Sequence, residues 1–402
     1  MDLLDDFDRD PSDRADCYNA LANGMLWLVE NGATDQADDI LTVPTSAYTD
    51  PARWAMEMEL IFKRLPLMLA LSIELPNPGD YKAMEMVGRP ILLTRDKDGK
   101  AHAFLNVCTH RGSPLAETGR GNCSRFSCPY HGWSFTNDGR LMGVAEPDKF
   151  GPIDRATRNL TALPCEERAG LIFAVLTPGA PIDVEQFLGG MLDDLAHFKF
   201  ETWHYVGSRE IFGANWKIAY DGYLEGYHFA ALHPQTILPF SLSGVNQFDG
   251  FGPHMRIGFP RTTIGDLRKV PEDQWWAREH EEYGFVRTLF PNISIALGLG
   301  VGQVAQLIPG PTPDKNRTIL NYIHPHAPGN EAERAETDKA MQFLRDVTND
   351  EDYVLGLKIQ KGLESGALDS VVFGRNERGN QFFHKCVEHY LADDPAAAFP
   401  RL

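Results

Sequence analysis

Two cysteines and two histidines within 24 positions are the first residues whose types and spacing suit metal chemistry. They are Cys108, His110, Cys128 and His131, arranged as C-x-H, seventeen further residues, then C-x2-H. Proline and glycine flank both pairs, which predicts two tight loops that hold one metal centre between them. A zinc ion with two sulfur and two nitrogen ligands is one interpretation. A [2Fe-2S] centre is the second, and the alternating order favours it, because each loop then gives one ligand to each iron.

The other cysteines fall outside this spacing and are interpreted as structural residues of loops or core. They are Cys17, Cys123, Cys165 and Cys386. Six cysteines in a long chain without a secretory signal do not indicate a disulfide framework. Their clustering indicates metal or redox work instead.

A second group of candidate ligands lies in NWKIAYDGYLEGYHFAALHP, residues 215–234, which is predicted to be helical. Asp221, Glu225 and His228 stand at i, i+4 and i+7 and would share one helix face. His233 comes five residues after His228, about 140° around an ideal helix. Both histidines can reach one metal only if the helix ends or distorts between them. Pro234 helps, because the residue before a proline is biased away from helical geometry.

The carboxylate that would complete this group is predicted far downstream, in TNDEDYVLGLKIQKGL, residues 348–363. Leu355, Ile359 and Leu363 lie three, seven and eleven residues after Asp352, on its face of a helix. An inward-pointing carboxylate needs a partner, and a cation is one. Asp350 and Glu351 are predicted to point elsewhere, into solvent. The alternative is that Asp352 is only an acid at a helix start, favoured by the macrodipole.

Both groups resemble one family, the Rieske non-haem iron oxygenases, in particular the α or terminal oxygenase subunit of aromatic ring-hydroxylating oxygenases. Residues 108–112 and 128–133 match the Rieske signature C-x-H-R-G…C-x-Y-H-G-W. The mononuclear-iron motif is matched by Asn215-Trp216-Lys217, Glu225, Tyr227-His228 and His233, and its downstream helix by Glu351, Asp352 and Gln360. The sequence departs from the family at Gly222, where asparagine is common.

The resemblance implies cofactors and roles for named residues. Cys108, His110, Cys128 and His131 would hold a Rieske [2Fe-2S] cluster, and His228, His233 and Asp352 a mononuclear Fe(II) that uses O2. Glu225 would hydrogen bond His228 and His131 of the partner subunit in a head-to-tail homotrimer, and Asp221 would support the motif helix. Electrons would come from NAD(P)H through a reductase, with or without a ferredoxin. Whether a β subunit joins is left open.

The elements that must position these residues indicate an α+β protein with three segments. Residues 1–75 are predicted to be a helical segment that packs on the catalytic domain. Residues 76–177 carry short strands and Asp-Gly turns at 98–99 and 138–139, and form a small all-β Rieske domain. Residues 178–402 form a larger catalytic domain, helix-grip-like, with a central antiparallel sheet. Its substrate pocket is expected to be apolar, with candidate lining residues Phe229, Leu232, Leu238, Phe240, Phe251, Phe285, Ile293, Ile295 and Leu297.

Composition limits the remaining function classes. The 402 residues carry a net charge of −18 without a Lys/Arg cluster, which argues against nucleic acid as a partner. The sequence has no run of about 18 apolar residues and no secretory signal, so a cytoplasmic location away from membranes is expected. The leading hypothesis is a terminal oxygenase that hydroxylates an aromatic or other hydrophobic substrate. The alternatives are a monooxygenase for O- or N-demethylation or quaternary-amine oxidation, a Rieske electron carrier and, most remotely, a zinc-stabilised binding protein.

Overall fold

The structure is a computed structural model that describes residues 11–394 and 397–402. It divides into two compact units, Met58–Thr202 and a larger unit that joins the residues before Met58 to Trp203–Leu402. Both units combine helices with antiparallel sheets, in agreement with the predicted α+β class. No helix among the described residues is long and apolar enough to cross a lipid bilayer.

The smaller unit is built from three antiparallel sheets, in the orders β10-β5-β4-β3-β6, β11-β12-β2 and β7-β8-β9. The strands are β2 Leu67–Leu71, β3 Asp80–Met86, β4 Arg89–Arg95, β5 Ala101–Leu105, β6 Gly119–Asn122, β7 Phe126–Ser127, β8 Ser134–Phe135, β9 Leu141–Gly143, β10 Ala162–Leu163, β11 Cys165–Arg168 and β12 Leu171–Ala174. Its short helices are η1 Met58–Phe62, η2 Ser72–Glu74, α4 Pro147–Phe150, η3 Arg155–Arg158, α5 Val184–Leu188, α6 Gly190–Ala196 and η4 Phe200–Thr202.

The two predicted Asp-Gly hairpins are confirmed in this unit. Strands β4 and β5 pair around the first turn and β8 and β9 around the second. Gly99 and Gly139 have φ of +83° and +82°, which glycine adopts without the steric cost other residues meet. The hairpins carry the loops that precede and follow the four candidate cluster ligands.

The larger unit has a seven-stranded antiparallel sheet in the order β13-β19-β18-β17-β16-β15-β14. Its strands are β13 His204–Gly213, β14 Gln247–Phe251, β15 His254–Pro260, β16 Tyr283–Leu289, β17 Ile293–Ala296, β18 Gly302–Pro309 and β19 Asn316–His324, and β1 Leu41–Pro44 pairs separately with β20 Ser370–Phe373. The helices are α1 Pro11–Glu30, α2 Ser46–Thr49, α3 Pro51–Glu57, α7 Trp216–Asp221, α8 Phe229–Leu232, η5 Ile264–Lys269, η6 Glu272–Arg278, α9 Glu331–Asp346, η7 Val347–Tyr353, α10 Val354–Glu364 and α11 Arg378–Ala392.

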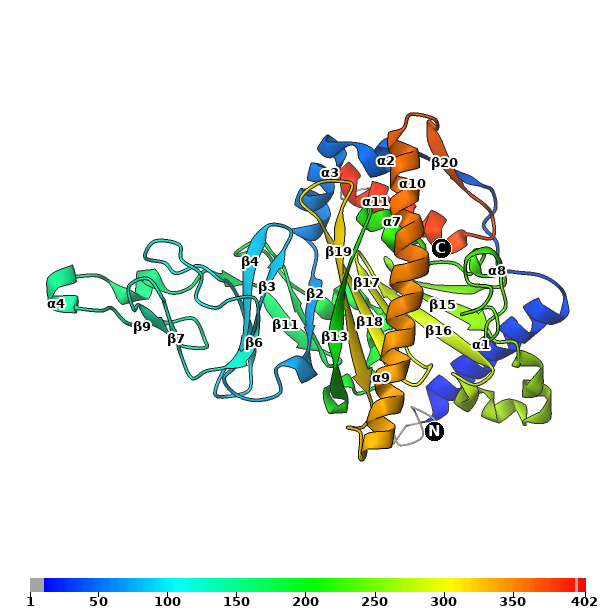
Figure 1. Ribbon diagram of the computed structural model, residues 1–402, viewed down its shortest axis with the longest axis horizontal. Helices are drawn as coiled ribbons and strands as arrows, with labels where there is room; N and C mark the ends of the chain where they lie inside the picture. Colours follow the sequence, from blue (N-terminus) through cyan, green and yellow to red (C-terminus); the bar gives the residue numbers. More distant parts are fainter. Residues whose placement is uncertain (1–10, 395–396) are drawn as a thin grey trace. The chain divides into compact units, whose positions relative to one another are not determined.

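Helices α9, η7 and α10 follow one another as a single long helix across one side of this sheet (Figure 1). The side chain of Asn330 caps its start by accepting a hydrogen bond from the Glu333 amide, as a helix N-terminus requires. All eight residues of β18 are buried, so both faces of the sheet are covered at its centre. The helix predicted in residues 348–363 is therefore confirmed as part of this long helix, and it places Asp352 beside the sheet.

The N-terminal segment differs from the prediction. The helix expected through residues 52–71 ends at Phe62, and Leu67–Leu71 is instead a fully buried strand that pairs with β12. Pro66 interrupts the helical hydrogen bonds, and the apolar run after it fits a strand. The chain passes from one unit to the other between residues 57 and 58 and again between residues 202 and 203. The predicted boundaries lay at 75/76 and 177/178. Residues 1–10 of the expected helical segment lie outside the described residues.

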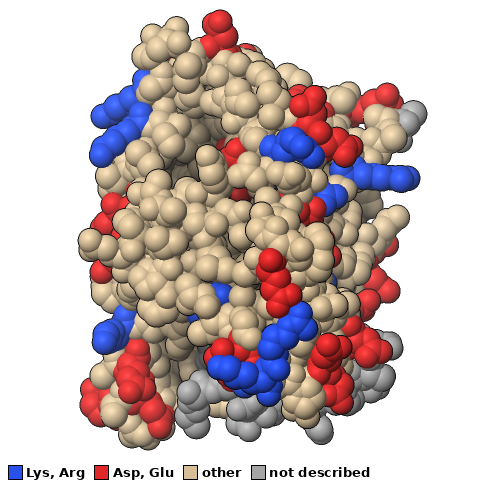
Figure 2. Space-filling model, turned by 90° about the vertical axis from the view of Figure 1, so that its right-hand side faces the viewer, with Lys and Arg blue, Asp and Glu red and all other residues tan. Residues whose placement is uncertain are grey.

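The acidic excess is spread over the surface rather than gathered in one place on the face drawn in Figure 2. On this face Lys and Arg stand among Asp and Glu, and a broad middle area carries neither kind of side chain.

Candidate metal centres and cavities

The first metal centre lies on two loops of the smaller unit that have the same backbone geometry. In the first, the Cys108 amide donates to the Ser113 carbonyl at 2.8 Å and the Gly112 amide donates to the Cys108 carbonyl at 2.9 Å. The second loop, residues 128–133, repeats both bonds at 2.7 and 3.0 Å. The glycine of each loop has a positive φ, so each tight turn depends on a residue without a side chain. The two loops therefore present their Cys and His in equivalent ways.

The four candidate ligands come together as a cysteine pair and a histidine pair. The rings of His110 and His131 have centroids 4.6 Å apart, and both Nδ1 atoms are buried without a hydrogen-bond partner. Burial raises the pKa of Cys108, and the neighbouring Cys128 thiol adds to that shift. Buried polar atoms without partners are costly unless another group, such as a metal, satisfies them. The donors thus fit a bound metal centre.

The spacing of these donors separates the two metal interpretations. One zinc ion needs all four ligand atoms at about 2.0–2.3 Å from a common centre. Among the described residues, the group of three or more side chains that could hold a single metal ion is His228, His233 and Asp352, and it includes none of these four. A two-iron cluster instead takes two cysteines on one iron and two histidines on the other. The paired arrangement therefore fits a Rieske-type cluster.

Aromatic side chains pack against the two imidazoles of this site. Trp133, which is buried, stacks on His110 with a centroid distance of 4.8 Å and an interplanar angle of 7°. Phe150 contacts the edge of the same ring at 5.5 Å, and Tyr130 lies 3.7 Å from His131. These contacts restrict the orientation of the two imidazole rings, and the orientation of an imidazole affects how it binds a metal.

The second metal centre lies in the larger unit, in a segment that is not one continuous helix. Helix α7 ends at Asp221, and the next helix, α8, contains only Phe229–Leu232. The prediction that Asp221, Glu225 and His228 share a helix face is therefore wrong. His228 is the residue before α8 and His233 the residue after it, with φ −115° and ψ 41°. The helix thus begins and ends between the two histidines, as a shared metal requires.

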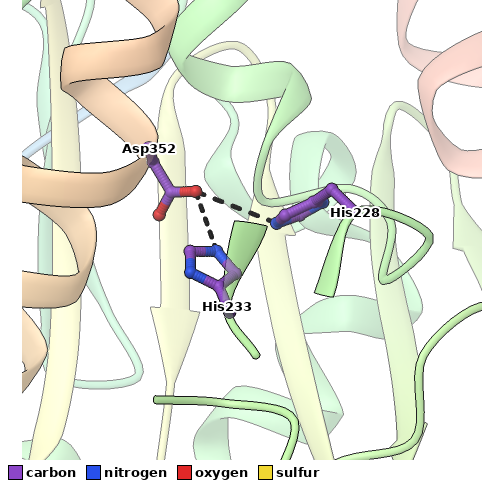
Figure 3. A group of neighbouring side chains, drawn as sticks. All are labelled: His228, His233 and Asp352. Carbon is purple, nitrogen blue, oxygen red and sulfur yellow. Dashed lines mark ion pairs between the residues drawn. The ribbon is translucent and has the colours of Figure 1, made fainter. Parts of the chain in front are cut away.

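His228, His233 and Asp352 converge on one point, from α8 and from the long helix (Figure 3). Asp352 Oδ1 is 3.0 Å from His233 Nε2 and 3.8 Å from His228 Nε2. Their three ligand atoms all lie within 4.8 Å of one another. Two imidazoles and one carboxylate are the donor set of a facial-triad iron site, so these residues fit a mononuclear iron.

Each imidazole of the triad is oriented by a carboxylate on its far nitrogen. Glu225 accepts a hydrogen bond from His228 Nδ1. Glu351 accepts one from His233 Nδ1 and another from the Thr236 hydroxyl, the latter at 2.8 Å. Such partners fix the tautomer and orientation of a ligating imidazole and leave the other nitrogen for the metal.

Glu351 was predicted to point into solvent, and its contact with His233 was not predicted. The reason is local: Val347–Tyr353 is a π-helix, with i→i+5 hydrogen bonds. Its wider turn reduces the angle between consecutive residues, so Glu351 and Asp352 both reach the histidines. The only sequence signal was the acidic pair itself, because the residue pattern of this segment does not predict a π-turn.

Asp221 and Asn215 connect α7 to the helices around it. The Tyr48 hydroxyl donates to Asp221 Oδ2 at 2.9 Å, and His384 Nε2 lies 3.0 Å from Oδ1. Asn215 caps α7 by accepting from the Lys217 amide, and its own amide group donates to the Tyr48 carbonyl. Asp221 is therefore a structural partner of three helices, with no atom in the ligand group.

A buried ion pair lies under the same helix. Glu57 and Lys217 are 0% and 1% exposed, with Nζ 2.6 Å from Oε1, and Trp216 Nε1 donates to Glu57 Oε2 at 2.9 Å. Burial lowers the pKa of Lys217, and the Glu57 carboxylate opposes that shift. The Asn-Trp-Lys motif thus fixes α7 in the core.

Two cavities flank the triad within the larger unit. The larger, about 250 Å³, touches His228 and Asp352 and contains three further acids, Asp221, Glu225 and Glu377. Leu355, Ile359 and Leu363 line it beside Asp352, but the first two are 38% and 43% exposed. Asp352 was predicted to point inward, and its carboxylate does point toward His228 and His233, but its side chain is 28% exposed and its helix face opens onto this cavity.

The smaller cavity, about 140 Å³, lies behind Phe229. Of the predicted lining residues, Phe229, Phe285 and Leu297 line this cavity and Leu232 lines the larger one. Ile293 and Ile295 are core residues of the sheet. Phe240 is 46% exposed and lines neither cavity, and neither do Leu238 and Phe251.

Two family models match the chain over separate segments. The model described as Rieske [2Fe-2S] domain matches residues 66–161, and that described as Ring hydroxylating alpha subunit (catalytic domain) matches residues 200–393. The matched segments contain both candidate metal centres.

The chain is similar to oxygenase subunits. It is 29% identical over 375 residues to the carnitine monooxygenase oxygenase subunit of Escherichia coli (strain K12), covering 88% of this chain and 94% of that one. It is 31% identical to the anthranilate 1,2-dioxygenase large subunit of Acinetobacter baylyi, but that match spans only 49% of this chain and 43% of the relative. A crystal structure of the quaternary ammonium Rieske monooxygenase CntA with L-carnitine has a TM-score of 0.75 at 23% identity, covering 89% and 96%, and shows the same fold.

Proposed function

The chain belongs to the Rieske oxygenases, and we propose that it is the terminal oxygenase of a multicomponent system that oxidises a hydrophobic organic substrate with O2. Its Rieske cluster and mononuclear iron imply electrons supplied through a reductase. When bound, these groups supply one-electron transfer and the activation of O2, which no protein side chain provides. The single observation that carries the proposal is the convergence of His228, His233 and Asp352 beside a cavity.

The residues of the chain hold and orient these groups. Cys108 and Cys128 would hold one iron of the cluster and His110 and His131 the other, in line with their pairing. His228, His233 and Asp352 would hold the mononuclear iron through Nε2 and a carboxylate oxygen. The whole of Met58–Thr202 would form the cluster domain, wider than residues 76–177, and the rest of the described chain the catalytic domain.

We further propose a head-to-tail homotrimer in which Glu225 bridges two subunits. One carboxylate oxygen accepts from His228 Nδ1, and the carboxylate lines the larger cavity. His131 of the partner subunit would approach Glu225 from this side. Exposed apolar residues on α10, including Val354, Leu355 and Ile359, support a contact surface there. Heterologous contacts of this kind close into rings.

We also propose the source of the electrons and the location of the protein in the cell. We place NAD(P)H at the start of the chain of carriers, with a reductase and, in some arrangements, a ferredoxin. The acidic surface and six free cysteines suit the reducing cytoplasm.

Oxidation of a quaternary amine or a demethylation is the second candidate reaction. One observation favours it over ring dihydroxylation: the carnitine monooxygenase subunit matches along 94% of its length, whereas the anthranilate dioxygenase subunit matches along 43%. Product analysis by mass spectrometry, with a reductase and a panel of both substrate types, separates the two.

The test of the oxygenase function is His228→Ala. The variant should keep the red-brown colour and the EPR signal of the reduced cluster, lose mononuclear iron by metal analysis, and form no product. His326→Ala is the matched control, because His326 is outside the triad. A His228→Ala protein that still formed product at the wild-type rate would support the electron-carrier alternative for this chain.

A further inference from the structure

The smaller cavity differs from the larger one in charge. It is lined by the apolar side chains of Phe229, Phe259, Phe285, Val286, Ala296, Leu297, Leu299 and Leu344, two glycines, Ser241 and Arg261, and by no acid. Phe229 forms the end nearest the iron triad, with its ring 5.0 Å from that of His228. One cation therefore faces an apolar space beside the metal site.

Arg261 has no counter-ion of its own. Among the described residues, its guanidinium takes part in no hydrogen bond and no ion pair, although the residue is only partly exposed. The nearest acid, Glu282, is already paired with Arg278 through two bonds of 2.9 and 2.7 Å. Burial lowers the pKa of Arg261, but a guanidinium remains charged in proteins. A desolvated charge without a partner is costly, so the site is suited to an anion.

A second polar group without a hydrogen-bond partner lies next to Arg261. The side chain of His280 is 7% exposed and lies behind Gly298, outside the cavity lining, and neither ring nitrogen has a hydrogen-bond partner. Burial lowers its pKa to about 4, so at neutral pH the ring is uncharged and offers one N–H donor. Glu279, 3.8 Å from Nε2, is engaged with Arg287 at 3.2 Å.

Two glycines lie against these side chains. A Cβ on Gly298 would lie 3.0 Å from His280 Nδ1 and 3.4 Å from Arg261 Nη2, and one on Gly284 would lie 3.9 Å from the same Nη2. Both glycines line the cavity, together with Arg261, whereas His280 lies behind Gly298. A side chain at Gly298 would press on the His280 ring and reach the guanidinium of Arg261, so the glycine keeps that guanidinium open to the cavity.

We propose that Arg261 forms a carboxylate-binding subsite, so that the substrate of this oxygenase is an organic acid with an apolar body. The inference rests on the proposed function and deepens it. Arg261 would bind the carboxylate, the uncharged His280 beside it would not compete as a counter-ion, and the aromatic side chains would pack on the body that points toward Phe229 and the triad. The four acids of the larger cavity would repel the same anion, so the two cavities discriminate by charge.

The experiment compares acids with partners that lack the carboxylate, on the full-length holoenzyme. Benzoate is paired with benzamide, and trimethylglycine with choline, so that an aryl body and an ammonium body are tested separately. Affinities are measured by anaerobic calorimetry. For the body type that fits, the acid should bind at least about tenfold more tightly than its partner, because a charge-assisted hydrogen bond is lost in the partner.

Substitutions of single residues show which side chain causes the difference in affinity. Arg261→Gln should weaken binding of the acid about tenfold or more and leave its partner compound within twofold. His280→Phe, which keeps an uncharged ring behind Gly298, should leave the affinity for the acid within about threefold of wild type, and a loss as large as that of Arg261→Gln would contradict the assignment to Arg261. Arg268→Gln is the control, because Arg268 is an exposed arginine of the same segment that pairs with Glu30. If Arg261→Gln does not fold, Arg261→Lys should fold and keep a preference for the acid of at least threefold.

The outcomes are separable from those of the oxygenase proposal. Equal affinity within both pairs, no binding of either acid at millimolar concentration, or an equal loss for acid and partner in Arg261→Gln would overturn the subsite. Reductase-driven O2 consumption is measured in parallel. Oxidation of the compounds without a carboxylate alone would reject the subsite and keep the oxygenase. Acid-selective binding that depends on Arg261, without oxidation of any acid, would keep the subsite and reject the oxygenase.

Discussion

The two metal centres are assembled in opposite ways. The proposed cluster ligands stand within residues 108–131, on two loops whose backbone bonds are the same. The proposed iron ligands come from a break in one helical segment and from a π-turn more than a hundred residues later. The first site depends on local turns, and the second on how α7, α8 and the long helix pack. Substitutions that disturb helix packing should therefore affect the iron site and leave the cluster site intact.

The largest expected effects come from removing one ligand of each site. Cys128→Ser should abolish acid-labile sulfide and turnover but leave mononuclear iron at wild-type content. Asp352→Ala should do the reverse, with the cluster spectrum unchanged and product formation at background. Metal analysis with EPR of the reduced protein measures both. Loss of both metals in either variant would show that the sites do not form independently.

Next in size is the buried ion pair under α7. Glu57→Ala leaves the Lys217 ammonium and Trp216 Nε1 buried without their partner, which should destabilise the larger unit by about 3–5 kcal/mol. Denaturant unfolding followed by tryptophan fluorescence measures this. The exposed pair Lys63–Glu59 provides the control, since Glu59→Ala should cost under about 1 kcal/mol. If Glu57→Ala were as stable as Glu59→Ala, the buried ion pair would not contribute to positioning the iron site.

Smaller effects are expected from the carboxylates behind the histidines. Glu351→Gln should weaken iron binding about 10- to 100-fold, because His233 loses the acceptor that sets its tautomer. Glu225→Gln should keep both metals and slow turnover, since its proposed role includes a contact with the partner subunit. Iron titration and steady-state O2 uptake distinguish the two. If both variants lost iron equally and turnover followed iron content, Glu225 would have no bridging role.

The smallest effect tests the loop geometry of the cluster. Gly112 has φ +83°, and a Cβ there would meet nothing within 4 Å, so Gly112→Ala measures backbone strain alone. We expect a loss of about 1–2 kcal/mol in the smaller unit. Gly362→Ala, in α10 and equally free of contacts, should be neutral or stabilising by up to about 1 kcal/mol. Equal behaviour of the two variants would mean that the loop does not depend on a left-handed residue.

Much of the candidate chemistry could be predicted from residue types and short spacings. The Cys-His pairs, the Asp-Gly turns and the antiparallel strands depend on neighbours within a few positions, and the structure contains the predicted turns and strands. Spacing also indicated that a helix had to end between His228 and His233, because one ideal helix could not bring both to a metal. Where a regular helix was assumed, prediction failed, at Leu67–Leu71 and for the shared face of Asp221, Glu225 and His228.

The sequence by itself therefore determined the ligand types, the local loops and the family of this protein, because those follow from chemistry at short range. Only the tertiary structure decided that Glu351 supports His233, that Glu57 neutralises Lys217, and that Arg261 lines an apolar cavity. Each of these depends on the packing of segments distant in the chain, where burial removes water and makes the choice of partner energetically decisive. A residue pattern does not carry that information.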